Sequence, residues 1–224
     1  MSPKLYLCLA AFVALIVAAA PAAAQNSDDL RQLPERQAVY ELGIFADCIA
    51  ARRTNRARAL VLSPFDSAEQ EKAVDRVTQR VDDACIRSGF GDILMSVRRD
   101  MLAGAVARAL LNREYRDLAQ VINPATADVA AERLRAAQLG VPERFGRCVV
   151  WNDAAGVHAL LKAAPGSRPE AQAIEGLKQD MGMCLEEGHT LRLDRTFVRN
   201  IVAISAYRLA QQLRPSGLNQ ERPR

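Results

Sequence analysis

Aromatic residues and histidine are scarce in this chain of 224 residues: aromatic side chains make up 5% of it, and His158 and His189 are its two histidines. Strands are enriched in aromatic and β-branched residues, and no long stretch alternates between apolar and polar residues, so the sequence predicts no β-sheet. Catalytic, metal and cofactor motifs are lacking too. Asp153 precedes His158 by five residues and so lies on a different helix face, which disfavours a catalytic triad. We therefore expect no cofactor and no metal.

Long apolar runs are rare as well. The one run without a charged residue covers residues 5–20, after Lys4 and before small residues at positions 22–24. This order is typical of a signal peptide, and we predict that residues 1–24 are cleaved. The alternative is an uncleaved anchor, but a spanning helix needs about 20 apolar residues and this run is shorter. The sequence therefore predicts a periplasmic or secreted bacterial protein that is soluble after cleavage.

Lysine is the scarcest of the charged residues. The 30 basic residues comprise 4 Lys and 26 Arg, and together with abundant alanine this indicates a GC-rich genome rather than selection for a phosphate partner. Removal of Lys4 with the signal peptide lowers the formal net charge from +4 to +3. Because this balance is weak and an exported protein rarely meets nucleic acid, no nucleic-acid partner is expected.

An internal repeat is the strongest positive feature of the sequence. The stretch over residues 45–108 returns over residues 145–208, and a match at one fixed offset is typical of a duplicated structural unit. Cys85 and Gly89 return as Cys184 and Gly188, one residue short of that offset. The pairs at an offset of 100 residues include Phe45 and Phe145, Cys48 and Cys148, Ala59 and Ala159, Leu60 and Leu160, Ser67 and Ser167, Arg99 and Arg199, Ala103 and Ala203, and Arg108 and Arg208.

Four cysteines remain after cleavage: Cys48, Cys85, Cys148 and Cys184. In an oxidising compartment pairing is the default, and four cysteines can pair in three ways. Since each repeat carries two, duplication favours Cys48 with Cys85 and Cys148 with Cys184. Metal binding and thiol chemistry are disfavoured, because no two cysteines are two residues apart and no histidine is near them in the sequence.

Apolar residues recur at spacings of three and four through most of the mature chain, as in helices with one buried face. In each repeat a serine and a Gln or Glu three residues later form a capping box, which starts a helix. The boxes are Ser67 with Gln70 and Ser167 with Glu170. We expect the helices that they start to continue to the glycines at positions 89 and 188, since glycine is the usual helix stop.

The third helix of each repeat is the most apolar, over residues 92–112 and 194–213. Small residues such as Gly104 and Ser205 allow close approach of two backbones, so we expect these helices to pack on each other and join the halves. The predicted fold is all-α, with two tandem disulfide-clamped three-helix units in one helical domain. The predicted segments are a signal peptide (1–24), a mobile segment (25–33), repeat 1 (34–115), a connecting turn and short helix (116–140), repeat 2 (141–213) and a disordered tail (214–224).

The strongest local charge cluster consists of Arg52, Arg53, Arg56 and Arg58. It is expected to interrupt the first helix, as Asp153 does in the second repeat. Attraction to anionic lipid is one interpretation of the cluster. A solvated helix face is favoured, because the second repeat replaces this cluster with Asn152, Asp153, Ala154 and Gly156.

The predicted function is that of a non-catalytic scaffold in the bacterial periplasm, which binds another exported protein or a peptide. Stacked helical units build extended binding surfaces. One alternative is a periplasmic enzyme with a carboxylate-based site that the sequence does not reveal. Another is a membrane-surface protein that uses the arginine cluster.

Overall fold

The computed structural model describes residues 26–79, 85, 99–123 and 129–214. The chain divides into two compact units, residues 1–37 and residues 38–224. The second unit carries all side-chain contacts discussed below. Within the described ranges most residues are helical and none lies in a strand, which confirms the predicted all-α class. The predicted signal peptide lies outside the described residues, as does the predicted tail beyond Arg214.

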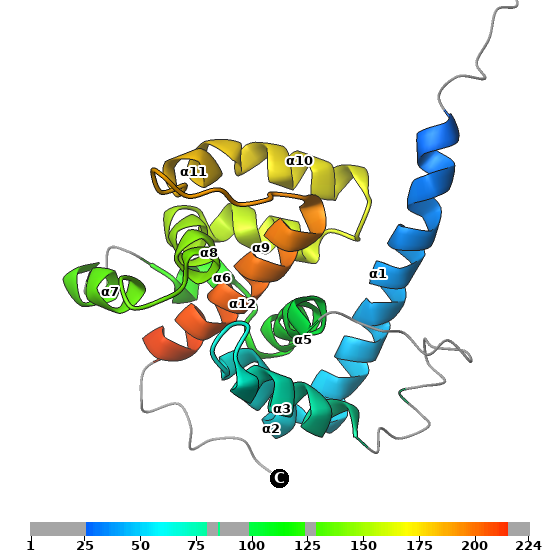
Figure 1. Cartoon of the computed structure of the whole chain (residues 1–224), viewed down its shortest axis with the longest axis horizontal. Coiled ribbons are helices and arrows are strands. Elements are labelled where there is room, and N and C mark those ends of the chain that lie inside the picture. The colour runs from blue at the N-terminus through cyan, green and yellow to red at the C-terminus, as the bar shows by residue number, and fades with distance from the viewer. Residues whose placement is uncertain (1–25, 80–84, 86–98, 124–128, 215–224) are drawn as a thin grey trace, which may run out of the picture. The chain divides into compact units, whose positions relative to one another are not determined.

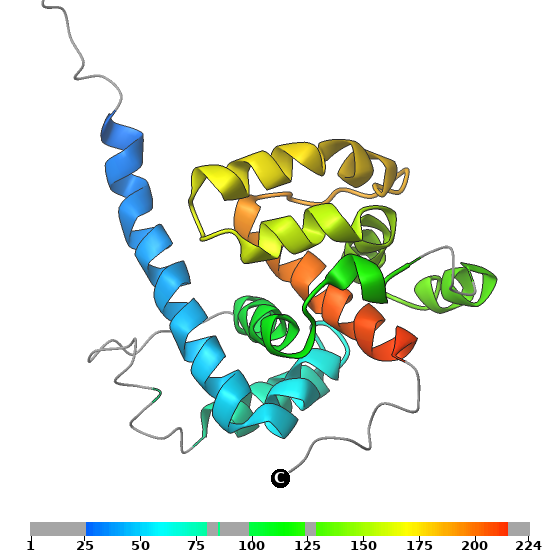
Figure 2. The same ribbon diagram turned by 180° about the vertical axis from the view of Figure 1, so that it is seen from behind.

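The described residues form a series of mostly short helices (Figures 1 and 2). Their bounds are α1 Asn26–Arg52, α2 Thr54–Leu62, α3 Ala68–Thr78, α5 Arg99–Glu114, α6 Leu118–Val121, α7 Val129–Ala136, α8 Val141–Asn152, α9 Ala154–Lys162, α10 Arg168–Gly176, α11 Lys178–Met183 and α12 Arg195–Leu213.

Helix α12 is the centre of the second unit. It packs along α5 and α8, and it also contacts α2, α6 and α9. Figures 1 and 2 show α2 and α3 on one side of it and α9 and α10 on the other. Eleven of its 19 residues are buried, which is typical of a helix enclosed by its neighbours on most sides.

Two glycines allow the close approach of α5 and α8 to α12. A Cβ atom on Gly104 of α5 would lie 2.6 Å from Cα of Asn200, and one on Gly146 of α8 would lie 2.9 Å from the carbonyl oxygen of Ile201. Real Cβ contacts are longer than this, so both positions need a residue without a side chain. The expected packing of the third helices on each other is therefore present between α5 and α12.

The first helix of each repeat is interrupted where the sequence predicts. A single residue, Arg53, separates α1 from α2, and Asp153 separates α8 from α9. The Asp153 carboxylate accepts a hydrogen bond from the backbone N–H of Gly156 at 2.7 Å, as an N-terminal cap does. Arg53 makes no such bond and instead donates to the backbone carbonyl of Gln79 at 2.7 Å.

The loop between α2 and α3 contains the first predicted capping box. The hydroxyl of Ser67 accepts a hydrogen bond from the backbone N–H of Gln70 at 3.1 Å. In return, Oε1 of Gln70 accepts from the backbone N–H of Asp66 at 3.0 Å, one residue further back than in a standard box. The capping box therefore stabilises the backbone of Asp66 in the loop as well as the start of α3.

The loop between α9 and α10 has the same arrangement. Ser167 accepts from the N–H of Glu170 at 3.2 Å, and Oε2 of Glu170 accepts from the N–H of Gly166 at 2.6 Å. Gly166 and its counterpart Asp66 both have positive φ, 72° and 53°. Glycine adopts this conformation freely, and aspartate is among the few other residues that tolerate it.

The structure contains two disulfide bonds. They join Cys48 to Cys85 and Cys148 to Cys184, with Cα–Cα distances of 5.6 and 5.7 Å, and these are the two pairs that the repeat predicts. Disulfides are typical of proteins in oxidising compartments, so both bonds fit a non-cytoplasmic protein. Among the described helices, none has the length and apolar character needed to cross a membrane.

Helix α1 begins at Asn26, within the segment over residues 25–33. Pro34 lies inside this helix, although proline suits the first turn of a helix best. A helical assignment does not measure motion, so the mobility of residues 25–33 stays a prediction.

The helix predicted to reach Gly188 differs in the structure. It is divided into α10 and α11, and α11 ends at Met183. Gly176 is the last residue of α10, and glycine in a helix interior is unfavourable by about 1 kcal/mol relative to alanine. Gly188 lies in a turn with a φ of 80°. The counterpart, Gly89, lies outside the described residues.

Candidate functional site

Arginine side chains bound to the ends of short helices are the main polar feature of the second unit. The last four carbonyls of a helix have no partner within it, and this fold has many helix ends. At α2 and α9, arginines of α12 supply the missing donors, and each of these arginines is also paired with a carboxylate.

Arg199 of α12 binds the end of α9. Its Nη1 donates to the carbonyl of Leu160 at 3.1 Å and to Oε1 of Glu170 at 2.7 Å, and its Nη2 donates to the carbonyl of Ala163 at 2.7 Å. The side chains of Arg199 and Glu170 are 8% and 5% exposed. Glu170 therefore serves both as a capping-box residue and as the counter-ion of a buried guanidinium.

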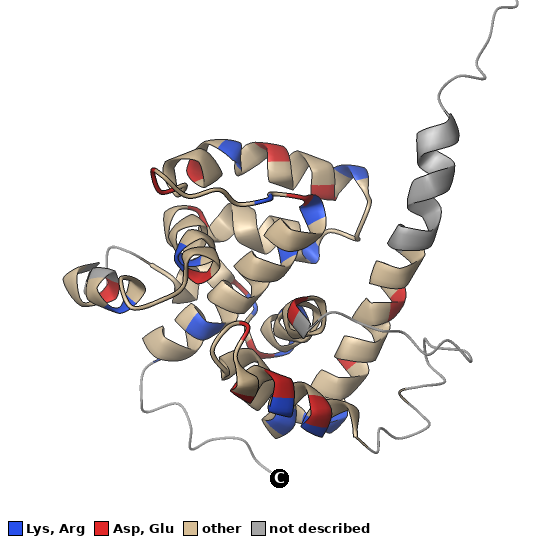
Figure 3. Ribbon diagram, viewed as in Figure 1, with Lys and Arg blue, Asp and Glu red and all other residues tan. Residues whose placement is uncertain are grey.

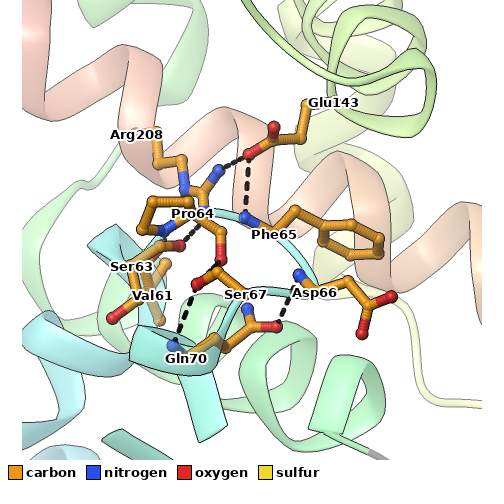
Figure 4. Close-up of polar contacts among 9 residues, drawn as sticks. All are labelled: Val61, Ser63, Pro64, Phe65, Asp66, Ser67, Gln70, Glu143 and Arg208. Carbon is orange, nitrogen blue, oxygen red and sulfur yellow. Dashed lines mark hydrogen bonds and ion pairs between the residues drawn. The ribbon is translucent and has the colours of Figure 1, made fainter. Parts of the chain in front are cut away.

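Arg208, nine residues or about two and a half turns further along α12, binds the end of α2. Its Nε donates to the carbonyl of Val61 at 2.7 Å, and its two Nη atoms donate to Oε1 of Glu143 and to the carbonyl of Ser63. The same Glu143 oxygen accepts from the backbone N–H of Phe65 at 3.4 Å. Figure 4 shows the Arg208 side chain between Glu143 and the loop after α2. We call these five residues the Arg208 cluster.

Burial lowers the pKa of both guanidinium groups, Arg199 and Arg208. In each case the paired carboxylate opposes this effect, while a second arginine, Arg108 or Arg147, adds to it. Arginine nonetheless remains protonated in proteins. The carboxylates are therefore needed as counter-ions, because an unpaired buried charge is strongly destabilising.

A groove of about 560 Å³ opens beside the Arg208 cluster, between the end of α2, the end of α7 and helices α8 and α12. Gln138, Gln212 and Arg135 line it together with Arg208. Arg147, also in the wall, donates to Glu132 of α7 at 2.6 Å in a second buried ion pair. We call this the Arg208 groove. Its walls combine amide groups with fixed positive charge.

A second groove, of about 230 Å³, lies between residues 39–47 of α1, helix α5, the loop after α9 and the start of α12. Nη2 of Arg108 donates there to both carboxylate oxygens of Asp47 at 3.1 Å and to the carbonyl of Gly43 at 3.3 Å. Asn200 lines the same groove, and its Nδ2 is buried without a hydrogen-bond partner among the described residues. We call this the Arg108 groove.

The two grooves are lined by residues at matching sequence positions. Seven residues that line one groove have a counterpart exactly 100 residues away that lines the other. They are Val39 and Leu139, Gly43 and Glu143, Asp47 and Arg147, Leu62 and Lys162, Pro64 and Ala164, Ala105 and Ser205, and Arg108 and Arg208.

A third polar cluster surrounds the buried carboxylate of Glu114. It accepts hydrogen bonds from Nε of Arg58 at 3.0 Å, from Nε2 of Gln211 at 2.9 Å and from the hydroxyl of Tyr207 at 3.2 Å. Burial and the nearby Glu114 raise the pKa of Tyr207, and the same causes raise the pKa of Tyr115 to about 12. Arg58, Tyr207 and Gln211 all donate to the same carboxylate, so the cluster ties α2, α5 and α12 together.

The arginine cluster predicted as a surface contact is largely bound within the chain. Nη1 of Arg53 and Nη1 of Arg56 each donate to a backbone carbonyl at the end of α3, at 2.7 and 3.2 Å. Arg58 donates to the buried carboxylate just described, and Arg52 is exposed. Figure 3 shows basic and acidic residues close together around α2 and α3.

Neither histidine joins a catalytic arrangement in the described part of the chain. His158 lies within α9 and lines a cavity of about 10 Å³, and the exposed His189 lies 3.7 Å from a carboxylate oxygen of Glu186. Among the described residues no group of three or more His, Cys, Asp or Glu is placed to hold a metal ion.

The sequence analysis missed the roles of Glu143, Arg199 and Arg208, which build the buried ion pairs. One signal was available: Arg99 and Arg108 return at the offset of the repeat as Arg199 and Arg208. Arginine at a fixed position in both copies of an apolar helix is a candidate for a buried role.

No protein-family model matches this chain, and no curated protein or solved structure matches it.

Proposed function

We propose that the chain is an exported, non-catalytic binding protein, and that its Arg208 groove holds an extended segment of another exported protein. The groove itself is the observation that carries this proposal. Its volume of about 560 Å³ lies within the range of about 300–1,000 Å³ in which most ligand sites fall.

The walls of the Arg208 groove are held in place before any partner arrives. Glu143 on α8 pairs with Arg208 on α12, and Glu132 on α7 pairs with Arg147 on α8. Arg208 also binds the carbonyl of Ser63 at the end of α2. Preorganised walls favour affinity because fewer side chains must be ordered on binding.

The chemistry of the walls indicates the kind of segment. The amide of Gln138 and the NH2 group of Gln212 can pair with the backbone of an extended segment, while Oε1 of Gln212 accepts a hydrogen bond from Nη2 of Arg147. Arg135 is exposed at the rim, and Leu62 adds an exposed apolar side chain. We therefore propose a partner segment that is extended and combines acidic with apolar side chains.

Export and duplication belong to the same proposal. We propose that residues 1–24 are a cleaved signal peptide, so the mass of the chain recovered from the periplasm should correspond to a start at Gln25.

We also propose that two tandem three-helix units arose by duplication, with α1 and α2, or α8 and α9, counted as one interrupted helix. The matching helix breaks, loop conformations and groove residues support this.

Binding to a membrane surface through the arginine cluster is the weaker alternative. Arg53, Arg56 and Arg58 donate hydrogen bonds to other parts of the chain, so lipid headgroups would have to compete for them.

Photo-crosslinking in cells would test the binding site. A benzoyl-phenylalanine at Leu62, inside the Arg208 groove, should capture one polypeptide, and Arg135→Glu should reduce the yield at least tenfold. The matched control is the same probe at Met183, an exposed residue of α11 outside the groove. Equal capture at both positions, or a yield unaffected by Arg135→Glu, would contradict the proposal.

A further inference from the structure

Position 43 and its counterpart 143 differ in a way that points to a ligand. In the second repeat, the carboxylate of Glu143 meets Arg208. At the position 100 residues earlier the residue is Gly43, and Arg108, which pairs through Nη2 with the exposed Asp47, lines an open groove. We propose that the Arg108 groove binds a short aliphatic carboxylate, with its carboxyl group placed as the Glu143 side chain is in the other half. This inference rests on the duplication within the proposed function and concerns a different groove from the one proposed for the partner segment.

The geometry at Gly43 supports this placement. A Cβ atom on Gly43 would lie 3.4 Å from Nη2 of Arg108, so an atom at this place is already in contact with the guanidinium. The groove volume of about 230 Å³ lies below the range of about 300–1,000 Å³ for drug-sized ligands. A short acid suits this space better than a peptide.

Hydrogen-bond donors for the carboxylate are present. Arg108 uses Nη2 for Asp47 and Gly43, and its Nε and Nη1 make no bond to a described residue. Nδ2 of Asn200 is buried without a described acceptor, and a buried donor without an acceptor is costly. The loop cannot supply a donor at the counterpart of Phe65, because Pro165 has no N–H. Asn200 takes that role in our proposal.

The charges around the groove favour an anion. Arg108, Arg199 and Lys162 line it together with the carboxylate of Asp47, and Glu170 pairs with Arg199 from outside the lining, so three basic groups face two carboxylates. Burial lowers the pKa of Arg199, and despite the opposing effect of Glu170 the proximity of Arg108 lowers it further. The two guanidinium groups therefore repel each other, and an anion between them would relieve this repulsion. Asp47 is exposed, so solvent screens its effect on the ligand.

Apolar side chains provide a wall for the aliphatic stem. Leu42, Met101 and Ala105 line the same groove, and Leu42 and Met101 also belong to or pack against the hydrophobic core. A ligand with a charged head and a short apolar tail therefore matches both parts of the groove.

The test is an NMR titration of the whole exported chain, with both disulfides intact, using butyrate and its neutral isostere butyramide. Butyrate should shift the Asn200 side-chain amide and the backbone amides of Gly43 and Gly104 saturably, with a dissociation constant on the order of 1 mM. Butyramide should bind at least tenfold more weakly. Equal affinity for the two compounds, or no saturable shift at these residues, would overturn the proposal.

Two variants at position 43 distinguish the effect of a negative charge from the effect of a larger side chain. Gly43→Glu places a carboxylate of the chain itself at Arg108 and should abolish butyrate binding, while Gly43→Ala should retain it to within about threefold. Both changes replace a helical glycine with a better helix former, so folding should be preserved. Binding by Gly43→Glu that equals that of the natural chain would refute the site. Crosslinking at Leu62 does not depend on this result, so failure here leaves the proposed function standing.

Discussion

Carbonyl groups at the ends of α2 and α9 both accept hydrogen bonds from an arginine of α12, but the two arginines do not correspond in sequence. At α9, the guanidinium comes from Arg199, 39 residues from the carbonyl of Leu160. At α2, it comes from Arg208, 147 residues from the carbonyl of Val61. Helix ends that correspond in sequence therefore need not be satisfied by corresponding residues.

The third residue of the helix that follows each loop, Gln70 in α3 and Glu170 in α10, explains much of this difference. Glu170 can cap its loop and neutralise Arg199 together, because its two oxygens bind different groups. Gln70 caps the first loop equally well, but a neutral amide cannot balance a guanidinium. The arginine that serves α2 has its counter-ion elsewhere, at Glu143 of α8.

Removing the counter-ions should have the largest effect on this comparison. Glu170→Gln and Glu143→Gln each leave a buried guanidinium uncompensated, and we expect each to lower the free energy of unfolding by about 3–5 kcal/mol. Urea denaturation at pH 7 measures this. The matched control is Glu175→Gln at the exposed pair with Lys178, where a loss below about 1 kcal/mol is expected. Losses equal to the control would show that neither pair is buried in solution.

Removal of each disulfide bond in turn compares how much the two bonds contribute to the free energy of unfolding. The bonds close segments of nearly equal length, with sequence separations of 37 and 36, so the chain-entropy model predicts equal losses of about 4 kcal/mol. The variants are Cys48→Ser with Cys85→Ser, and Cys148→Ser with Cys184→Ser, measured by urea denaturation. A difference above about 1 kcal/mol between them would mean that unfolded-chain entropy does not dominate.

Gly104 of α5 and Gly146 of α8 contact α12, and their substitution compares the packing of these two helices on α12. Gly104→Ala and Gly146→Ala should each cost about 1–3 kcal/mol, because the added methyl group meets α12 at short distance and forces the helices apart. Thermal unfolding measures the loss. Gly182→Ala is the control: its Cβ would meet nothing within 4 Å, so the change should be neutral or slightly stabilising. Tolerance of alanine at position 104 would contradict the described approach of α5.

Alkaline pH should give the smallest effect. Burial and Glu114 raise the pKa of Tyr115 to about 12, whereas an unfolded tyrosine ionises near pH 10. The unfolded chain therefore loses its proton first, so this contribution to stability is complete below about pH 10 and falls as the pH rises toward about 12. Urea midpoints at pH 9 and pH 11 measure this loss of stability, and Tyr115→Phe should make the loss smaller. An equal loss of stability between pH 9 and pH 11 in this variant would show that Tyr115 ionises normally in the folded chain.

Local patterns were enough to predict the helical class and the interruptions at Arg53 and Asp153, and the repeat predicted the cysteine pairs. All of these depend on residues close in sequence or on one fixed offset. The helix boundaries at Asn26 and Met183 were not predicted, because polar composition and a glycine further along the chain are weak signals for where a helix begins and ends.

The grooves could not be predicted, because they depend on contacts without periodicity. Arg208 binds Val61 across 147 residues and Glu143 across 65, and no local pattern distinguishes it from an arginine on a solvated helix face. The repeat alone was also misleading here: it suggests that Arg108 and Arg208 have like partners, while the structure pairs one with Asp47 and the other with Glu143.

The contact between Arg208 and the end of α2 has a consequence for chain synthesis. A polypeptide that emerges with its N-terminus first folds its early segments before the late ones exist. The carbonyls of Val61 and Ser63 stay without their guanidinium until residue 208 has appeared, so the early half is completed by nearly the last helix to be made. Chains truncated before α12 should therefore be recognised as unfinished and degraded, even though the first disulfide can already form.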